Sequence, residues 1–217
     1  MKSLLLGSLM AVAITACGGN DDAVDLQFDA ANPQATYAAE RLKSVLKERN
    51  LEKSDFEIKL TLSPDKLKPE AFTITPGDQS LVVSGGDGRG VIYGAMSVVE
   101  QLRNGATLGA IKQEKGETSR AFRAIKFDLT WESYRSSSAL DLHLDTVKDI
   151  KYWEKFLDMM VENRFNALTL WNLHPFPYMI KSKNFPEASK FTDAELAEWK
   201  KFYQTIFHMA KVRGINT

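Results

Sequence analysis

The chain has 217 residues, of which 44% are hydrophobic and 26% are charged, a balance typical of a globular protein rather than a disordered or fibrous one. Lys and Arg together number 28 and equal Asp and Glu together, so no net charge favours nucleic acid as a partner. Cys17 is the only cysteine, and the 3 histidines lack metal-ligand spacing. We therefore expect no disulfide, no metal and no cofactor.

The first residues have the pattern of an export signal. Lys2 precedes an apolar run, Leu4 to Ile14, that is too short to span a bilayer. The tetrapeptide that ends at Cys17, Ile-Thr-Ala-Cys, resembles a bacterial lipobox. It predicts a lipoprotein signal peptide over 1–16, lipidation of Cys17 and a flexible tether over 17–23. The protein would then be lipid-anchored in the cell envelope, at the outer membrane or cell surface. The alternative is an ordinary secretory signal that contains a cysteine.

The next segment, residues 24–118, combines short strand patterns with two helix patterns. Alternating apolar residues and turn residues predict strands at 24–29, 56–62, 71–75, 80–84 and 107–111. A turn at Pro76-Gly77-Asp78 should make the third and fourth strands a hairpin. Helices are expected from Asn32 to about Asn50, and from Arg89 to Arg103. The pattern indicates an α+β layer.

Four glycines, Gly85, Gly86, Gly88 and Gly90, lie between the fourth strand and the second helix. No reading frame gives the G-x-G-x-x-G spacing of a dinucleotide site, and the Gly-Lys-Ser/Thr of a phosphate loop is absent. The glycines therefore indicate a tight strand-to-helix turn with positive φ angles rather than a nucleotide site.

Residues 90–94, Gly-Val-Ile-Tyr-Gly, and the strand and glycines before them resemble the end of a non-catalytic N-terminal domain. This domain occurs in exo-acting glycoside hydrolases such as the β-hexosaminidases of glycoside hydrolase family 20 and the α-glucuronidases. In those enzymes it packs beside a (β/α)8 barrel. The resemblance implies that residues 24–118 are an accessory domain without catalytic residues.

Residues 119–217 follow a polar linker at 112–120 and have a β-α-β-α order. Strands are expected at 121–131 and 166–173, and amphipathic helices after Thr146–Asp149 and from the capping box at Thr192 to Gly214. Residues 215–217 look like the start of a third strand. A whole barrel needs about 250 residues. We therefore predict the first two βα units of an incomplete TIM (β/α)8 barrel, in the N-terminal part of a longer enzyme.

Two motifs in this second part resemble the first barrel strands of family 20 enzymes. Residues 122–128, Phe-Arg-Ala-Ile-Lys-Phe-Asp, match the family's Phe/Tyr-Arg-Gly-x-x-x-Asp except at the glycine. Residues 165–168, Phe-Asn-Ala-Leu, are similar to its Met-Asn-x-Leu. The resemblance implies an exo-acting glycoside hydrolase that removes sugars from polysaccharide or glycoprotein glycans. Because Leu170-Trp171-Asn172 replaces the family's Trp-His-Leu, N-acetylhexosamine is not implied as the sugar.

Polar and aromatic residues follow both barrel-like strands, where the loops of such barrels form the active site. Aromatic faces suit sugar rings, and Asp or Asn side chains hydrogen-bond to hydroxyls. The resemblance adds an arginine at the start of the first strand as a sugar contact. The predicted substrate-binding residues are Arg123, Asp128, Trp131, Trp171, Asn172 and His174.

Each of these candidates has a structural alternative. Arg123 can pair with a carboxylate at the foot of the barrel, Asp128 can hold a loop, and the tryptophans can belong to the core. The resemblance places the catalytic Asp-Glu pair after the fourth barrel strand, so we expect no catalytic residue in this chain and no activity from it alone. The alternatives to a hydrolase are a non-catalytic glycan-binding surface lipoprotein and a truncated gene product that never folds.

Overall fold

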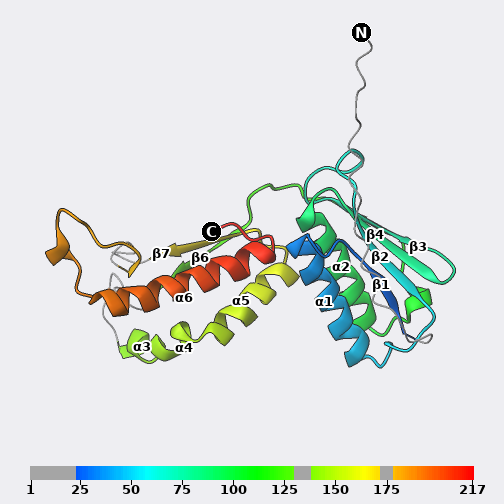
Figure 1. Cartoon of the computed structure of the whole chain (residues 1–217). Coiled ribbons are helices and arrows are strands. Elements are labelled where there is room, and N and C mark those ends of the chain that lie inside the picture. Colours follow the sequence, from blue (N-terminus) through cyan, green and yellow to red (C-terminus); the bar gives the residue numbers. More distant parts are fainter. Residues whose placement is uncertain (1–22, 130–137, 172–177) are drawn as a thin grey trace, which may run out of the picture.

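The computed structural model describes residues 23–129, 138–171 and 178–217, and these form two α/β layers side by side (Figure 1). The N-terminal layer, residues 23–118, contains a five-stranded sheet. The C-terminal layer, residues 119–217, contains a two-stranded sheet. Both layers combine strands and helices, as the sequence predicted at this coarse level.

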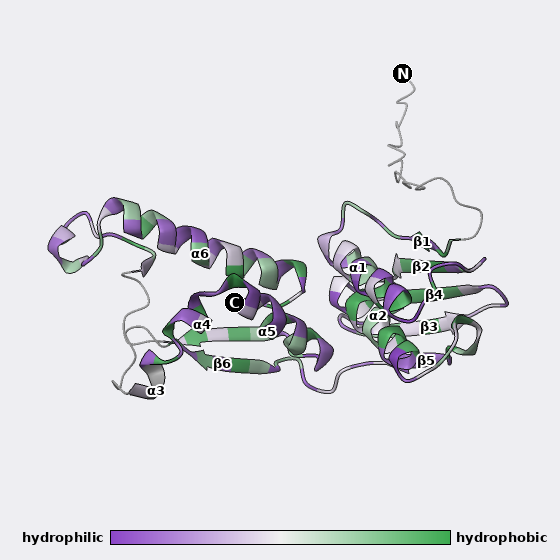
Figure 2. Cartoon of the chain, turned by 90° about the horizontal axis from the view of Figure 1, so that it is seen from below, coloured by the Kyte–Doolittle hydropathy of each residue, from purple (hydrophilic) through white to green (hydrophobic). Residues whose placement is uncertain are grey.

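The N-terminal layer is a mixed sheet with helices on one face (Figures 1 and 2). The strand order is β1-β2-β4-β3-β5, in which β1, β2 and β4 are parallel and β3 is antiparallel to both neighbours. The helices α1 and α2 lie side by side on the covered face. In chain order the elements are β1 (Asp25–Gln27), α1 (Pro33–Glu48), β2 (Glu57–Leu62), β3 (Phe72–Pro76), β4 (Ser80–Gly85), α2 (Gly88–Arg103), the 3-10 helix η1 (Leu108–Ala110) and β5 (Glu114–Gly116).

Local sequence signals explain where α1 begins. The Asn32 side chain accepts hydrogen bonds from the backbone N–H groups of Gln34 and Ala35. Pro33 occupies the first helical position, where a missing N–H costs nothing. The predicted start of this helix is therefore confirmed.

Two predictions near the end of this layer are wrong. The strand expected at 107–111 is instead η1, and the expected linker at 112–120 contains the strand β5. β5 has only three residues, Glu114–Gly116, without apolar alternation, and it is a strand because it pairs with the outer edge of β3. The predicted β3–β4 hairpin is confirmed.

The glycines between β4 and α2 allow backbone segments to approach closely. A Cβ atom on Gly86 would lie 1.9 Å from the carbonyl oxygen of Lys68, and one on Gly90 would lie 2.3 Å from that of Ala71. Neither backbone segment has room for a side chain there. The glycine-rich turn is therefore packed against residues 68–71.

The expectation of positive φ angles in this turn is wrong. Among the described residues the glycines with positive φ are Gly105 and Gly214, which follow the ends of α2 and α6. Gly85, Gly86 and Gly90 are needed because a Cβ would clash with backbone atoms, not because of their backbone angles.

The C-terminal layer places its helices on one face of a parallel pair of strands (Figure 1). Asn216 forms a parallel bridge with Ala167, so β7 has a neighbour on each side. Both strands begin later than the expected starts at 121 and 166. The elements are β6 (Ala124–Asp128), α3 (Ser138–Asp141), α4 (Leu144–Lys148), α5 (Ile150–Glu162), β7 (Ala167–Trp171), the 3-10 helix η3 (Pro186–Ala188) and α6 (Asp193–Val212).

Capping side chains set the starts of both long helices of this layer. At α6, Thr192 and Glu195 form the predicted capping box in both directions. At α5, Asp149 alone is the cap and accepts from the Lys151 N–H. Thr146, expected to share this role, lies inside α4.

Apolar side chains of both layers form one hydrophobic core cluster. Trp153 is its largest fully buried side chain, and the indole N–H donates to the Val147 carbonyl oxygen at 2.7 Å. No helix in the described ranges is long and apolar enough to cross a membrane. The interpretation of the C-terminal layer as the start of a TIM barrel stays a prediction.

Candidate functional site

The carboxyl ends of β6 and β7 bring two of the predicted residues together. The strands are parallel, and their register pairs Asp128 with Trp171. The Leu129 N–H continues the ladder with a 2.7 Å hydrogen bond to the Trp171 carbonyl oxygen. Side chains paired in register share a face of the sheet. A carboxylate and an indole therefore lie side by side at this end of the sheet.

The β6–β7 sheet has one covered face and one open face. On the covered face the Phe127 ring packs against Trp153 and Phe156 of α5, with centroid distances of 4.8 and 5.2 Å. Lys126 and Thr169 alternate with the covered positions and are exposed. The two long helices lie on the opposite side (Figure 1). We call the exposed side, which carries Lys126, Asp128, Thr169 and Trp171, the open face.

Charged and aromatic groups touch one another on the open face. The Lys126 Nζ lies 3.8 Å from the centroid of the Trp171 ring and 3.8 Å from a carboxylate oxygen of Asp128. Trp171 remains 44% exposed. An exposed indole can stack on the apolar face of a sugar ring, and the carboxylate and ammonium can hydrogen-bond to hydroxyls beside it. The open face thus presents groups of the kinds that contact polyhydroxylated rings.

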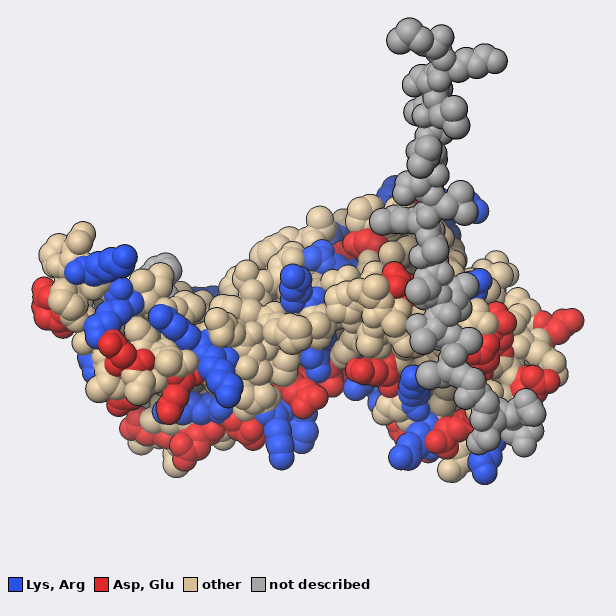
Figure 3. All heavy atoms as spheres, in the orientation of Figure 1, with Lys and Arg blue, Asp and Glu red and all other residues tan. Residues whose placement is uncertain are grey.

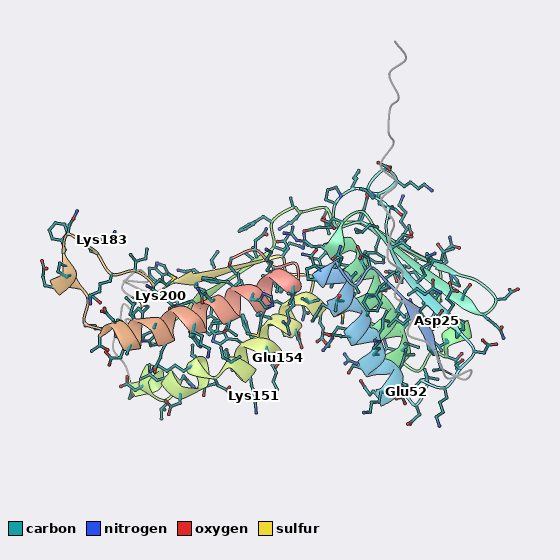
Figure 4. All side chains as sticks on the ribbon, in the orientation of Figure 1. Asp25, Glu52, Lys151, Glu154, Lys183 and Lys200 are labelled. Atoms are coloured by element: carbon teal, nitrogen blue, oxygen red, sulfur yellow. The ribbon has the colours of Figure 1, made fainter. Side chains whose placement is uncertain are left out.

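The segment between β7 and α6 extends past this end of the strands. Figure 4 shows Lys183 at the far end of the segment, and the nearby Phe185 is 63% exposed. At its root, Tyr178 is buried and its ring lies 4.9 Å from that of Phe191. Burial first, and then the charge of Tyr203, raise the pKa of the Tyr178 phenol to about 12, so it stays neutral.

Arg123, the third predicted residue that the structure describes, lies elsewhere. It precedes β6 at the amino end of the strand, five residues before Asp128. At about 3.3 Å per residue, this places it about 16 Å from the carboxyl end. The structure does not bring Arg123 together with the open face.

The guanidinium of Arg123 donates hydrogen bonds to other groups of the chain. Its Nη2 donates to Glu70 at 2.8 Å and to the Tyr93 hydroxyl at 3.1 Å, and its Nε donates to the Arg164 carbonyl oxygen at 2.7 Å. Its Nη1 donates to the Arg120 carbonyl oxygen. The alternative interpretation, a carboxylate partner at the foot of the strands, is the one that the geometry fits.

Glu70 is the residue of this region that the sequence did not reveal. It lies in the 68–71 segment between β2 and β3, is 6% exposed and has a φ of 65°. Burial alone would raise the pKa of its carboxyl group. Hydrogen bonds from Asn166, Arg123 and Arg89 and the charge of Arg123 outweigh burial and hold the pKa below its usual value. No motif marks Glu70, because its partners come from distant parts of the chain.

A second polar contact joins the layers between α1 and α5. Asp158 accepts from the Tyr37 hydroxyl at 2.8 Å, from Arg41 at 3.3 Å and from Arg213 at 2.7 Å. Burial, and then the charge of Asp158, raise the pKa of Tyr37, which keeps this hydroxyl a donor. An open groove of about 570 Å³ runs beside the contact.

Several predictions lie outside the described residues. Trp131, Asn172 and His174 belong to the two undescribed segments of the C-terminal layer, and Cys17 belongs to the undescribed residues 1–22. Within the described residues no group of three His, Cys, Asp or Glu side chains could hold a metal ion. Figure 3 shows basic and acidic side chains interspersed along the lower edge of both layers.

No protein-family model matches the sequence, and no curated protein matches it. Solved structures do resemble it. A GH138 enzyme targeting pectin rhamnogalacturonan II is 30% identical with a TM-score of 0.75, and the match covers 88% of this chain and 23% of that one. A glycoside hydrolase family 20 β-N-acetylglucosaminidase is 16% identical with a TM-score of 0.54, over 95% of this chain and 40% of that one.

A third similar structure is a family 115 4-O-methyl-α-glucuronidase with specificity for decorated arabinogalactans. It is 14% identical with a TM-score of 0.50, and the match covers 84% of this chain and 28% of that one. The chain therefore has a fold found in glycoside hydrolases. The chain spans less than half the length of each of these enzymes.

Proposed function

We propose that this chain is the N-terminal part of an exo-acting glycoside hydrolase of the cell envelope, which removes sugars from polysaccharide or glycoprotein glycans. Residues 24–118 are the accessory domain, and residues 119–217 supply the first two βα units of a (β/α)8 barrel. Residues 1–16 are the signal peptide, and a lipid on Cys17 anchors the mature protein through the tether at 17–23. The enzyme class rests on the similarity to solved glycoside hydrolases.

The open face of β6 and β7 is the observation that carries this proposal. In a closed barrel, alternate side chains of each strand point into the interior, while the others face the surrounding helices. Phe127 already packs against α5, so Lys126, Asp128, Thr169 and Trp171 would face the interior. Asp128 and Trp171 would then lie at the carboxyl end, where barrel enzymes have their active sites.

In this proposal Trp171 stacks on the sugar ring and Asp128 hydrogen-bonds to its hydroxyls. Trp131, Asn172 and His174 follow the same two strands in the sequence, and in this proposal they complete the sugar contacts. Arg123 supports the strand from its other end. The catalytic carboxyl pair required for glycoside hydrolysis belongs to later strands, which is why this chain alone is expected to be inactive.

Sugar binding is the direct test. We expect saturation-transfer NMR on the 217-residue chain to show contact with neutral or acidic monosaccharides, and Trp171→Ala to abolish it. Leu62→Ala is the matched control, because Leu62 is also exposed, at 46%, but lies in the N-terminal layer. Binding that survives Trp171→Ala would remove the open face as the sugar site.

The length of the native protein separates hydrolase from binding protein. An antibody against residues 24–118 would detect the protein in source cells, and intact-mass analysis would follow. A mass well above 24.4 kDa, enough for a whole barrel, is expected. A mass near 24.4 kDa with sugar binding would indicate a non-catalytic glycan-binding lipoprotein, and absence of accumulated protein would indicate a defunct gene product.

The lipid anchor has its own test. With Cys17 intact, the protein should partition into the membrane fraction and incorporate labelled palmitate. Cys17→Ser should release it from that fraction without labelling. A wild-type protein that is secreted unlabelled would show that residues 1–16 act as an ordinary signal peptide.

A further inference from the structure

We infer that Glu70 is a positioning residue through which the N-terminal layer orders the amino ends of β6, β7 and residues 214–216. This inference concerns the junction of the two layers and does not depend on the sugar site. The group of side chains that it involves, here the Glu70 cluster, consists of Glu70, Arg89, Arg123, Asn166 and Asn216.

The glycine-rich turn holds Glu70 at the junction. The Gly86 N–H donates to the Ala71 carbonyl oxygen at 2.9 Å, and the Glu70 N–H donates to the Asp87 carboxylate at 2.9 Å. The same Asp87 carboxylate caps α2 by accepting from the Gly90 N–H at 2.8 Å. Because Gly86 and Gly90 have no Cβ, the turn can pack directly on residues 68–71. The glycines therefore serve to position the Glu70 carboxylate at the junction, and not to bind a phosphate group.

Two segments of the C-terminal layer meet at the Glu70 carboxylate. Arg123, just before β6, donates to one carboxylate oxygen at 2.8 Å. Asn166, just before β7, donates to the other at 2.7 Å through its side-chain amide. The amide oxygen of Asn166 in turn accepts the Arg123 backbone N–H at 2.9 Å. The starts of β6 and β7 are thus bonded both to Glu70 and to each other.

Arg89 of α2 extends this arrangement to the third segment. It pairs with Glu70 at 3.1 Å and donates to the Gly214 carbonyl oxygen at 2.6 Å and to the Asn216 side chain at 2.7 Å. Asn216 is the residue that bridges to Ala167 of β7. Every extended segment described in the C-terminal layer therefore begins at a contact with Glu70 or with its partner Arg89.

The contacts of Glu70 matter for stability because its carboxylate is buried. The Glu70 side chain is 7% exposed, whereas those of Arg89 and Arg123 are 25% and 19% exposed. A carboxylate at this depth is stable only with its partners, and its removal would leave two arginines without their counter-charge. A pair of short strands is itself only marginally stable. The N-terminal layer therefore supplies order that β6 and β7 lack alone.

The test is residue-resolved hydrogen exchange of the 217-residue chain with Glu70→Gln. This substitution keeps the shape but turns one oxygen into a donor that faces either Arg123 or the pair Arg89 and Asn166. We expect amide exchange at 124–128, 167–171 and 215–217 to become at least about tenfold faster. Exchange in β2 and β4, the centre of the N-terminal sheet, should stay within about twofold. The C-terminal layer should also unfold at a lower denaturant concentration than the N-terminal layer.

Glu117→Gln is the matched control, because Glu117 lies in the same layer and pairs with Lys68 at 3.8 Å but is 58% exposed. It should change no exchange rate at the junction. Uniformly faster exchange in Glu70→Gln would mean a general loss of stability, and faster exchange confined to residues 68–90 would mean a local role. Either result, or no change, would overturn the inference.

A second variant keeps the inference testable if Glu70→Gln does not fold. Arg123→Lys retains the charge but loses the fork of donors that joins Glu70, Tyr93 and two carbonyl oxygens. We expect faster exchange at 124–128 and 167–171, with 214–216 less affected because Arg89 still holds them. Unchanged or uniformly faster exchange in this variant would contradict a positioning role.

Discussion

The two ends of the β6–β7 pair differ in almost every physical respect. At the amino end, the Glu70 cluster buries a carboxylate among two arginines and an asparagine. At the carboxyl end, Asp128, Lys126 and Trp171 contact one another while remaining exposed. The same two strands therefore carry a satisfied polar network at one end and an exposed set of charged and aromatic side chains at the other.

This difference separates structural from functional polar residues. A side chain whose nitrogens each donate to acceptors within the chain has little left with which to bind a ligand, and the half-buried Arg123 is such a side chain. An exposed aromatic ring beside a carboxylate contributes little to the stability of the fold, and its face remains accessible to a ligand. Amino-end polar residues of barrel strands usually serve stability, and carboxyl-end ones serve function. Substitutions at both ends and a change of pH test this difference.

Asn166→Ala should have the largest effect. Asn166 is 2% exposed, and its loss removes the donor that it gives to Glu70, the donor of the Ala121 carbonyl oxygen and the acceptor of the Arg123 N–H. Glu70 keeps its two arginines. We expect the free energy of unfolding to fall by about 3 kcal/mol in urea denaturation. Asn163→Ala is the control: its side chain also bonds to a carbonyl oxygen, but at an exposed site, and it should cost less than about 1 kcal/mol. Equal losses of unfolding free energy in the two variants would show that Asn166 at the junction contributes no more to stability than an exposed asparagine.

Gly90→Ala should come next. The added Cβ would lie 2.3 Å from the Ala71 carbonyl oxygen, so the turn that presents Glu70 must shift. Overpacking of this kind costs about 2 kcal/mol, measured as a lower denaturation midpoint. Gly109→Ala is the matched control, since nothing lies within 4 Å of the Cβ it would add. A loss no larger than that of Gly109→Ala would mean that the turn tolerates the shift.

The pH dependence should report Glu70. Its pKa in the folded protein lies below its ordinary value of 4.5, because hydrogen bonds from Asn166, Arg123 and Arg89 outweigh the opposing effect of burial. Folding therefore gains stability from the carboxylate at pH values above 4.5 and loses it as the pH falls through the lowered pKa. The free energy of unfolding should drop less steeply on acidification in Glu70→Gln than in the wild type. Parallel slopes would show that other carboxylates dominate.

Trp171→Ala should have the smallest effect on stability, less than about 1 kcal/mol, because the ring is 44% exposed. The matched substitution Trp153→Ala, at a fully buried indole, should cost about 3–5 kcal/mol. The same two variants should reverse their order for sugar binding, where Trp171→Ala removes the stacking surface. A large loss of stability in Trp171→Ala would place this indole among the core residues, the alternative that its sequence left open.

Much of the fold could be predicted from local signals. Asn32 and Thr192 cap the helices that they were expected to cap, and the β3–β4 turn forms as its Pro-Gly-Asp sequence indicates. The parallel pairing of β6 with β7 agrees with their apolar runs. β5 could not be predicted, because three residues without apolar alternation become a strand only through an edge that β3 offers.

The candidate site was predictable to a smaller extent. Strand alternation and strand ends were enough to bring Asp128 and Trp171 into one set, and the register pairs them. The placement of Arg123 in that set relied on a motif resemblance, which does not say at which end of a strand a side chain finds its partner. The sugar-contact roles of the whole set remain predictions, and Trp131, Asn172 and His174 lie outside the described residues.

The long helices, most strands and the residues at the strand ends could be predicted from the sequence, because capping, turn chemistry and hydrophobic period act over a few residues. The short helices α3 and α4 begin where a polar loop was expected. The role of the glycine-rich turn, in contrast, depends on the tertiary structure. Its glycines allow backbone contact with residues 68–71, and this contact holds Glu70 against Arg123 and Asn166, 53 and 96 residues away in the chain. No local pattern encodes such a meeting, since a buried charge is defined by the partners that the whole fold brings to it.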